Sequence, residues 1–422
     1  MKKIPLTLTV ISMLIMAMSL PVLCGNVDAI EAAGHVRSVA SIAEVFGDGQ
    51  KVTAVAVEYD KIILSSKLSK STFSVDGRTI TKVYANNAPA KAAWGIDGRY
   101  AIVELSASDK GASTFAQNGP TSTRTEAKVS LMQTGDVTTI DGVKYGPDAT
   151  AMANDTKINL VVDDFKPFEF NDPNTGETLK YNLFIPKNYD KNKSYPMVMF
   201  IHDAGIISNE IDRTLVQGLG AVIWATPSEQ AKHECFVLAP QFANGGTGDS
   251  QRWDTIVDLI NSLAGQYSID KNRLYTTGQS MGCMLSIAIG IKYPDLFAGY
   301  LLVAGQWDAQ AMSVLAKKKM WIIVSEGDTR AFPGMNASLE VMEPKGARIS
   351  RATWNAKAGE AEMAANVKKI AEEDTNIKYA VFKKGTTLPE EEANSGRNEH
   401  MQTWWKAYSI EGVRDWLFEQ KK

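Results

Sequence analysis

Cysteine and histidine are scarce in this chain of 422 residues, which has three cysteines and four histidines. Beyond Cys24, which stands in the N-terminal apolar segment, only Cys235 and Cys283 remain. A protein with so few cysteines does not depend on a disulfide framework. The sequence has no CxxC and no HExxH motif, and its histidines are scattered. These absences argue against a structural or catalytic zinc site.

The sequence also has no large excess of positive or negative charge. The formal net charge is −3 and no block of basic residues occurs. A protein that binds nucleic acid or an anionic membrane surface usually carries such a block, so both partners are disfavoured. The length exceeds that of one ordinary domain and suggests two.

The first residues are typical of an export signal. Lys2 and Lys3 precede an apolar stretch, Ile4–Leu23, and small residues follow it. We interpret residues 1–29 as a signal peptide, which predicts a secreted, extracellular protein with no membrane attachment after cleavage. The candidate cleavage positions lie near Gly25, Ala29 and Ala33.

Two other interpretations of this segment are a retained membrane anchor and lipid attachment at Cys24. A lipoprotein signal normally places a small residue just before the modified cysteine. The residues before Cys24 are Pro21, Val22 and Leu23, which disfavours lipid attachment.

Residues 36–160 have the pattern of a β-sandwich domain. Short alternating runs such as Val52–Tyr59 and Tyr100–Leu105 are separated by turn signals, and no helical period stands out. Asp-Gly dipeptides, which suit tight hairpin turns, begin at Asp48, Asp76, Asp97 and Asp141.

Residues 165–422 change to alternating strands and helices. Continuous apolar runs are typical of parallel strands covered on both faces, and this segment therefore predicts an α/β domain with a mostly parallel sheet. The predicted strands are Met197–Ile201, Cys235–Ala239, Leu274–Thr277, Tyr300–Val303, Trp321–Val324 and Tyr379–Phe382. The predicted helices are Trp253–Leu263, Met281–Ile291, Glu360–Ala371 and Gly412–Phe418.

The motif with the most specific chemistry is Gly278-Gln279-Ser280-Met281-Gly282, a GxSxG. A predicted strand runs into it and a predicted apolar helix leaves it. This is the strand–turn–helix context of a nucleophile elbow, in which a strained serine projects from the sheet edge. Ser280 is therefore the predicted nucleophile, and the alternative is a solvated serine in a glycine-bounded turn.

A serine nucleophile needs a base, and only one histidine is in the right place. In enzymes with such an elbow the chain order is serine, acid, histidine. His400 is the only histidine after Ser280, and we expect it on a polar loop after the last strand. His400 is therefore the predicted base.

The acid must follow Ser280 on a loop at the same edge of the sheet. Asp328 follows the strand Trp321–Val324 and is the preferred candidate, with the role of orienting the imidazole. Asp308 follows the preceding strand and is the rival, and Glu326 is a further neighbour. Such a triad needs no cofactor and no metal, because it supplies both nucleophile and proton transfer.

Backbone amides at two places are candidates for an oxyanion hole. One is the amide of Met281, at the start of the helix behind Ser280. The other lies in the loop after the strand Met197–Ile201, where either Asp203 or Ala204 could donate. His202, in the same loop, is interpreted as a brace rather than a catalyst.

Taken together, residues 165–422 resemble the polyhydroxybutyrate-depolymerase-like and feruloyl-esterase-like branch of the α/β-hydrolases. The stretches that carry the resemblance are 195–205, 269–282, 293–297 and 325–328. The stretches 45–50 and 71–78 resemble the immunoglobulin-like N-terminal domain found on some of these esterases. Cys283 departs from the pattern, since much of the branch has a second glycine there. The resemblance implies an α/β-hydrolase fold preceded by an immunoglobulin-like sandwich, and a serine carboxylesterase.

The substrate is predicted less sharply. The connection from Val303 to Trp321 is too short for a large lid, which favours soluble short-chain or aryl esters, or acyl groups on a polysaccharide. Trp307, Trp404 and Trp405 could wall an acyl pocket or pack in the core. A serine peptidase of the same fold is the first alternative function, and a non-enzymatic binding protein is the second. The sequence indicates neither the oligomeric state nor the role of the β domain.

Overall fold

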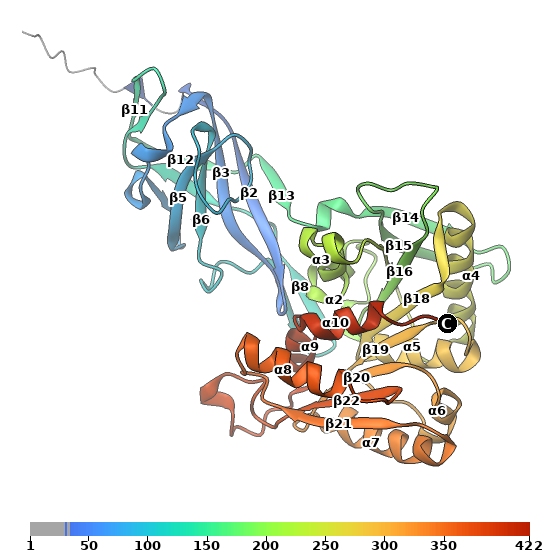
Figure 1. The fold of residues 1–422 in the computed structure, drawn as a ribbon. Coiled ribbons are helices and arrows are strands. Elements are labelled where there is room, and N and C mark those ends of the chain that lie inside the picture. The colour runs from blue at the N-terminus through green and yellow to red at the C-terminus, as the bar shows by residue number, and fades with distance from the viewer. Residues whose placement is uncertain (1–29, 32–33) are drawn as a thin grey trace, which may run out of the picture.

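The computed structural model describes residues 30–31 and 34–422. The predicted signal peptide and Cys24 lie outside these residues. Figure 1 shows an all-β body followed, beyond β13, by a larger body of strands and helices. Within the described part of the chain, no helix has the length and apolar character needed to span a membrane.

The front domain packs two β-sheets face to face. A five-stranded sheet has the order β13-β2-β3-β6-β5, and a three-stranded sheet has the order β12-β9-β4. The larger sheet consists of β2 (Val36–Phe46), β3 (Gly49–Ile63), β5 (Ile80–Asn86), β6 (Gly98–Leu105) and β13 (Thr156–Asn159). The smaller consists of β4 (Phe73–Val75), β9 (Ser130–Gln133) and β12 (Asp148–Ala153).

Alternation along β3 explains why the sandwich forms. Val55 and Val57 lie in the core between the two sheets, with Leu131 of β9. Ala54 and Ala56, on the opposite face of the strand, belong to a separate small cluster. The period of two therefore buries branched side chains on one face and small ones on the other.

Smaller elements complete the front domain. β1 (Ile30–Glu31), β10 (Val137–Thr138) and β11 (Lys144–Gly146) form a small sheet, and β7 (Phe115–Asn118) pairs with β8 (Thr121–Arg124) as a hairpin. Three short 3₁₀ turns are η2 (Ser65–Lys67), η3 (Lys70–Thr72) and η4 (Val162–Asp164).

The Asp-Gly dipeptides divide into two groups. Asp48-Gly49 turns β2 into β3 and Asp141-Gly142 turns β10 into β11, with positive φ at both glycines. The hairpin prediction is wrong for the other two. Gly77 has positive φ, but its turn connects strands of different sheets, and Gly98 simply begins β6.

The second domain is built on a nine-stranded sheet with the order β14-β15-β17-β16-β18-β19-β20-β22-β21. All neighbours are parallel except at β14-β15 and β15-β17. The strands are β14 (Lys166–Asn171), β15 (Thr178–Phe184), β16 (Tyr195–Ile201), β17 (Phe236–Gln241), β18 (Ile269–Gln279), β19 (Gly299–Val303), β20 (Met320–Ser325), β21 (Ile349–Trp354) and β22 (Ile377–Phe382).

Helices cover both faces of this sheet. On one face α4 (Ser250–Gln266), α5 (Met281–Lys292), α6 (Ala309–Met312) and α7 (Ala331–Met342) pack into one cluster. On the other face α1 (Arg213–Val216), α2 (Leu219–Val222), α8 (Glu360–Ala371), α9 (His400–Ala407) and α10 (Glu411–Phe418) pack into a second. The remaining short elements are α3 (Pro227–Lys232), η5 (Ala204–Ile206), η6 (Ile223–Ala225), η7 (Ser313–Leu315), η8 (Glu343–Lys345) and η9 (Glu390–Glu392).

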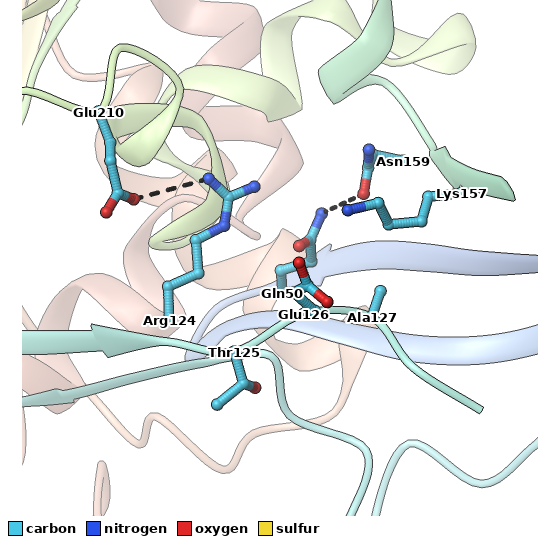
Figure 2. Close-up of a pocket in the computed structure, with 8 residues that line it drawn as sticks. All are labelled: Gln50, Arg124, Thr125, Glu126, Ala127, Lys157, Asn159 and Glu210. Carbon is cyan, nitrogen blue, oxygen red and sulfur yellow. Dashed lines mark hydrogen bonds and ion pairs between the residues drawn. The ribbon is translucent and has the colours of Figure 1, made fainter. Parts of the chain in front are cut away.

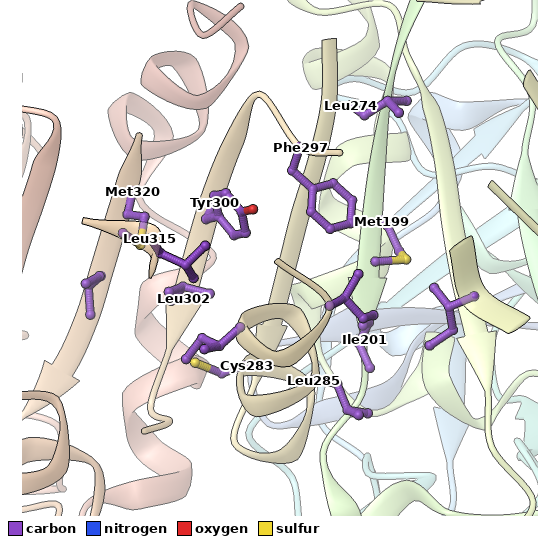
Figure 3. Close-up of a cluster of buried hydrophobic side chains, with 14 of the residues drawn as sticks. Met199, Ile201, Leu274, Cys283, Leu285, Phe297, Tyr300, Leu302, Leu315 and Met320 are labelled. Carbon is purple, nitrogen blue, oxygen red and sulfur yellow. The ribbon is translucent and has the colours of Figure 1, made fainter. Parts of the chain in front are cut away.

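α5 is the most deeply buried helix of the first cluster. Figure 3 shows Cys283 and Leu285 of this helix among side chains of the central strands and their neighbours. Cys283 and Cys235 are both buried free thiols, and burial raises the pKa of Cys235 to about 12. Both thiols are thus inert packing groups.

The six predicted strands and four predicted helices of this domain are all present. The prediction omitted β14 and β21 at the sheet edges, β15 next to β14, and the helices α1, α2, α3, α7 and α9. His400 was expected on a loop, and this expectation is wrong, because His400 is the first residue of α9. Its helix is short and is held by burial of Trp404 and Ala407 rather than by local propensity.

The two domains contact one another through the β7-β8 hairpin and the β2-β3 turn. Phe115, at the root of the hairpin, is 2% exposed and lies in the second cluster of the second domain. Arg124 of β8 donates to Asp212 at 2.7 Å. A polar cavity of about 310 Å³ remains between the domains, where Arg124 faces Glu210 and Gln50 bonds Asn159 (Figure 2). The front domain is therefore docked on the second domain by both apolar and polar contacts.

Candidate active site

A strained turn places Ser280 between β18 and α5. Ser280 has φ 51° and ψ −116°, a conformation that residues other than glycine rarely adopt. Such strain persists only where the surroundings enforce it, and it is concentrated at functional sites. The turn leaves Ser280 half-exposed at the carboxyl end of the central strand.

The two glycines of the motif are required by backbone packing. A Cβ atom on Gly282 would overlap the carbonyl group of Ile201, at the end of β16. A Cβ atom on Gly278 would overlap the backbone of Gly282. The first turn of α5 thus lies directly against the end of β16, where the loop with the second predicted oxyanion amide begins.

The structure brings the three predicted catalytic side chains together. His400 Nε2 lies 2.8 Å from Ser280 Oγ, and His400 Nδ1 lies 2.5 Å from Asp328 Oδ2. The Asp328 side chain is fully buried, whereas that of His400 is 29% exposed. The chain of contacts therefore runs from a buried carboxylate through an imidazole to an accessible hydroxyl.

Asp328 is held as a carboxylate despite its burial. Burial alone would raise the pKa of Asp328, but His400 and the amides of Ala331 and Arg330 outweigh this and hold it below its ordinary value. Both amides donate to Oδ1 at 3.0 Å. The other carboxylate oxygen is left to orient the imidazole.

The rival acids are engaged elsewhere. Asp308 is exposed and caps α6, where its Oδ1 accepts from the Ala311 amide at 2.8 Å. Glu326 is exposed and accepts from the Lys384 amide. Neither side chain bonds His400.

Glu399, which precedes His400, anchors the histidine. Its carboxylate is 1% exposed and accepts hydrogen bonds from Ser325 Oγ at 2.7 Å, the Gly385 amide at 2.6 Å and Thr387 Oγ1 at 2.7 Å. These donors lie just after β22 and at the end of β20. Glu399 therefore fixes the start of α9, where His400 lies, to the ends of β20 and β22.

The side chain of Asp203 holds the loop after β16 in place. Asp203 Oδ1 accepts from the Gly205 amide at 2.8 Å, and Oδ2 accepts from Gln279 Nε2 at 3.0 Å. Gln279 directly precedes Ser280, so Asp203 joins this loop to the serine turn. Ala204 begins η5 and is exposed, and its amide is at a helix start, where amides lack intrahelical partners.

His202 does brace this loop. Its Nε2 accepts from the Phe242 amide at 3.1 Å, so Nδ1 carries the proton and donates to the Asp203 carbonyl at 2.7 Å. The ring is completely buried, and burial lowers the pKa of His202 to about 4. His202 is thus neutral near pH 7 and has no free nitrogen for proton transfer.

The tryptophans differ in their positions. Trp307 is partly exposed, follows β19 and meets Trp253 edge-on, with ring centroids 6.3 Å apart. Trp404 is 3% exposed and packs edge-on against the His400 ring, with centroids 5.0 Å apart. Trp307 remains a candidate pocket wall, whereas the buried Trp404 supports the histidine and offers no surface to a substrate. Trp405 is partly buried against the second cluster.

The remaining histidines lie in other contacts. His35 bonds Asp60 and stacks on Tyr145, and His233 bonds Asp415. Among residues 34–422 there is no group of three or more histidine, cysteine or acidic side chains placed to hold a metal ion.

Sequence reasoning missed Gln279 and Glu399 as parts of the site. Both stand next to a predicted catalytic residue, so adjacency was the available signal. Adjacency alone does not show what a residue contacts. Glu399, for example, bonds Ser325, which is 74 residues away in the sequence.

Comparison with known proteins identifies both domains. Residues 38–146 match the family described as the esterase Ig-like N-terminal domain, and residues 179–352 match the esterase PHB depolymerase family. The front domain thus matches the esterase Ig-like family, and the second domain, which has the α/β-hydrolase fold, matches the esterase PHB depolymerase family.

Individual relatives are also esterases. A crystal structure of a thermostable esterase is 28% identical, covers 92% of this chain and 100% of that chain, and has a TM-score of 0.78. Acetylxylan esterase A of Aspergillus ficuum is 26% identical over 32% of this chain and 45% of its own length. A probable feruloyl esterase C of Aspergillus terreus is 26% identical over 30% of this chain and 46% of its own length. The match thus spans less than half of these curated relatives.

Gly282→Ala is expected to destabilise the protein. The new methyl group meets backbone atoms of Ile201, which can move only by opening the contact between α5 and β16. The free energy of unfolding should fall by about 1–3 kcal/mol, as in other overpacked sites. Urea denaturation followed by tryptophan fluorescence measures this. Gly265→Ala, at a helical glycine with open space around it, is the matched control and should cost nothing. Equal stability of the two variants would contradict the steric argument.

His202→Gln should make the free energy of unfolding less dependent on pH between pH 7 and pH 4. The folded state holds His202 with a pKa of about 4, below the unfolded value of 6.5, so the unfolded state binds more protons between these values. The contribution of a neutral His202 is present above pH 6.5 and is lost as pH falls towards 4. The loss is on the order of 3 kcal/mol. Unfolding free energies from pH 7 to 4 should therefore converge for wild type and variant. Parallel profiles would show that His202 does not titrate with unfolding.

Proposed function

From this pairing of an esterase Ig-like domain with a PHB-depolymerase-family domain, we propose that the chain is a serine carboxylesterase acting through Ser280, His400 and Asp328. The observation that carries the proposal is the continuous contact from Asp328 through His400 to a strained, accessible Ser280. A free serine hydroxyl is a weak nucleophile, and this arrangement is the one that activates it.

In acylation, Ser280 Oγ attacks the ester carbonyl carbon while His400 Nε2 takes the hydroxyl proton. Asp328 stays ionised and stabilises the imidazolium. The negative charge that forms on the carbonyl oxygen is accepted by the Met281 amide and by the amide of Asp203 or Ala204. When the tetrahedral intermediate collapses, the C–O bond to the alcohol breaks and His400 protonates the leaving oxygen.

Deacylation repeats the steps with water. His400 removes a proton from the water molecule, whose oxygen attacks the acyl carbon of the Ser280 ester. Collapse of the second intermediate returns the proton from His400 to Ser280 Oγ and releases the carboxylic acid. No redox change occurs, and all protons pass through His400.

The substrate class we propose is short acyl or aryl esters, either of small alcohols or attached to a polysaccharide. The connection after β19 holds only α6 and η7 before β20, so it forms no large lid. Trp307 lies in this connection, and its ring offers an aromatic wall to an acetyl or aryl group. The names of the relatives point the same way, since they include an acetylxylan esterase and a feruloyl esterase.

Substitution of the acid should separate Asp328 from its rival. Asp328→Asn is expected to lower kcat by about 10⁴-fold with KM little changed, because the amide favours the wrong imidazole tautomer. Asp308→Asn should lower kcat far less, because Asp308 only caps α6. Initial rates with a nitrophenyl ester measure both. His400→Ala should match Ser280→Ala in severity, since triad members act as a unit. A larger loss in Asp308→Asn would transfer the role of the acid to Asp308.

A substrate panel tests the reaction class. Nitrophenyl acetate, nitrophenyl butyrate and methyl ferulate should be hydrolysed, and Ser280→Ala should hydrolyse none of them. Peptide anilides, run at the same enzyme concentration, should react far more slowly. Labelling by a fluorophosphonate should occur in wild type and fail in Ser280→Ala.

Faster cleavage of peptides than of any ester would establish the peptidase alternative instead. A folded protein that is neither labelled nor active on the panel would support the non-enzymatic binding protein.

A further inference from the structure

The β7-β8 hairpin of the front domain lies directly on the loop that follows β16. Ser122 Oγ, on β8, donates to the Gly205 carbonyl at 2.7 Å. Arg213 of the catalytic domain donates to Ser122 Oγ at 3.0 Å and to the Ser122 carbonyl at 3.2 Å. A Cβ atom on Gly205 would overlap the Gln117 side chain and the Gly119 carbonyl, so the packing leaves no gap.

Gln117 reaches from this hairpin to the carboxylate of the same loop. Its Nε2 donates to Asp203 Oδ1 at 2.6 Å, across 86 residues of sequence. Its other acceptor is the Gly119 carbonyl at 3.2 Å, which holds the amide in place. Gln117 therefore extends the polar contacts of the serine turn into the other domain.

Asp203 is the point where three parts of the protein meet. Its carboxylate is buried, with the residue 3% exposed, and accepts from Gln117 of the front domain, Gly205 of its own loop and Gln279 of the serine turn. All three donors are neutral amides. A buried carboxylate depends on its hydrogen bonds for its stability, so loss of one donor leaves it to find another by moving.

Movement of Asp203 would move the backbone that it carries. Its carbonyl accepts from His202, and the second amide that we propose for the oxyanion hole is that of Asp203 itself or of Ala204, the next residue. Stabilisation of an oxyanion falls steeply when a donor is misplaced, because the donors are worth most when they are preorganised.

We propose that Gln117 is a positioning residue for catalysis: through Asp203, the front domain sets the oxyanion loop against Ser280. This inference rests on the proposed esterase function. It gives the front domain a role in the chemical step, although its Gln117 touches no reacting atom.

The test uses the full-length protein and Gln117→Leu, which keeps the side-chain bulk and removes the hydrogen bond. Arg124→Gln is the matched control, because it breaks a contact of the same hairpin with Asp212 and leaves Asp203 untouched. Steady-state rates with nitrophenyl acetate give kcat and KM. An aryl boronic acid, which forms a tetrahedral adduct with an active serine, reports the oxyanion hole separately.

We expect Gln117→Leu to lower kcat by about 10- to 100-fold, the range for a misplaced oxyanion donor, with KM little changed. The boronic acid should bind more weakly by a similar factor. The midpoint of the pH–rate profile should stay in place, because the contact between His400 and Asp328 is intact. Arg124→Gln should keep kcat within about twofold, because this partly exposed ion pair does not touch Asp203 or the serine turn.

Several outcomes would overturn the inference. These are a kcat of Gln117→Leu equal to that of wild type, an equal loss in Gln117→Leu and Arg124→Gln, or a rise in KM with kcat unchanged. Gln117→Asn, which is too short by one methylene, provides a second variant should the leucine variant not fold, and the same kcat loss and boronic acid effect are expected. Wild type that fails to hydrolyse the ester would instead refute the proposed function, so the two failures are distinguishable.

Discussion

The close approach of two backbones fixes the geometry of this protein's site. The first turn of α5 lies so near the end of β16 that position 282 has no room for a side chain. This contact places the serine turn and the following loop at a fixed separation without any side chain between them. The strained conformation of Ser280 is a result, since the chain must reverse sharply to bring α5 onto β16. Ser280, the helix start behind it and the loop beside it thus form one unit.

Around this unit, three buried carboxylates orient neighbouring loops, and each is satisfied by hydrogen-bond donors rather than by lysine or arginine. Asp328 accepts from His400 and two backbone amides, Glu399 from two hydroxyls and one amide, and Asp203 from three amides. Hydrogen bonds to a charged acceptor are directional and stronger than those between neutral groups. They therefore fix the positions of the loops more sharply than an ion pair with a flexible side chain would.

The features that could be predicted from the sequence are those marked by a local pattern or by the order of residues along the chain. The apolar runs of the central strands, the glycines around Ser280 and the order of serine, acid and histidine were sufficient to place His400 and Asp328 near one another. What could not be predicted depends on distant contacts. β21 joins the sheet only through its pairing with β22, and α9 forms because Trp404 is buried. Gln117 has no local signal, since its partner is chosen by the docking of two domains.

The docked hairpin has a consequence for the engineering of this protein. Immunoglobulin-like domains are often regarded as modules that can be exchanged or removed without effect on a neighbour. Here the hairpin of the front domain supplies Phe115 to the catalytic core and Gln117 to a buried carboxylate. A chimaera with a different sandwich domain would have to reproduce both contacts at the same register of the hairpin. An engineered exchange would therefore have to treat the two domains as one unit.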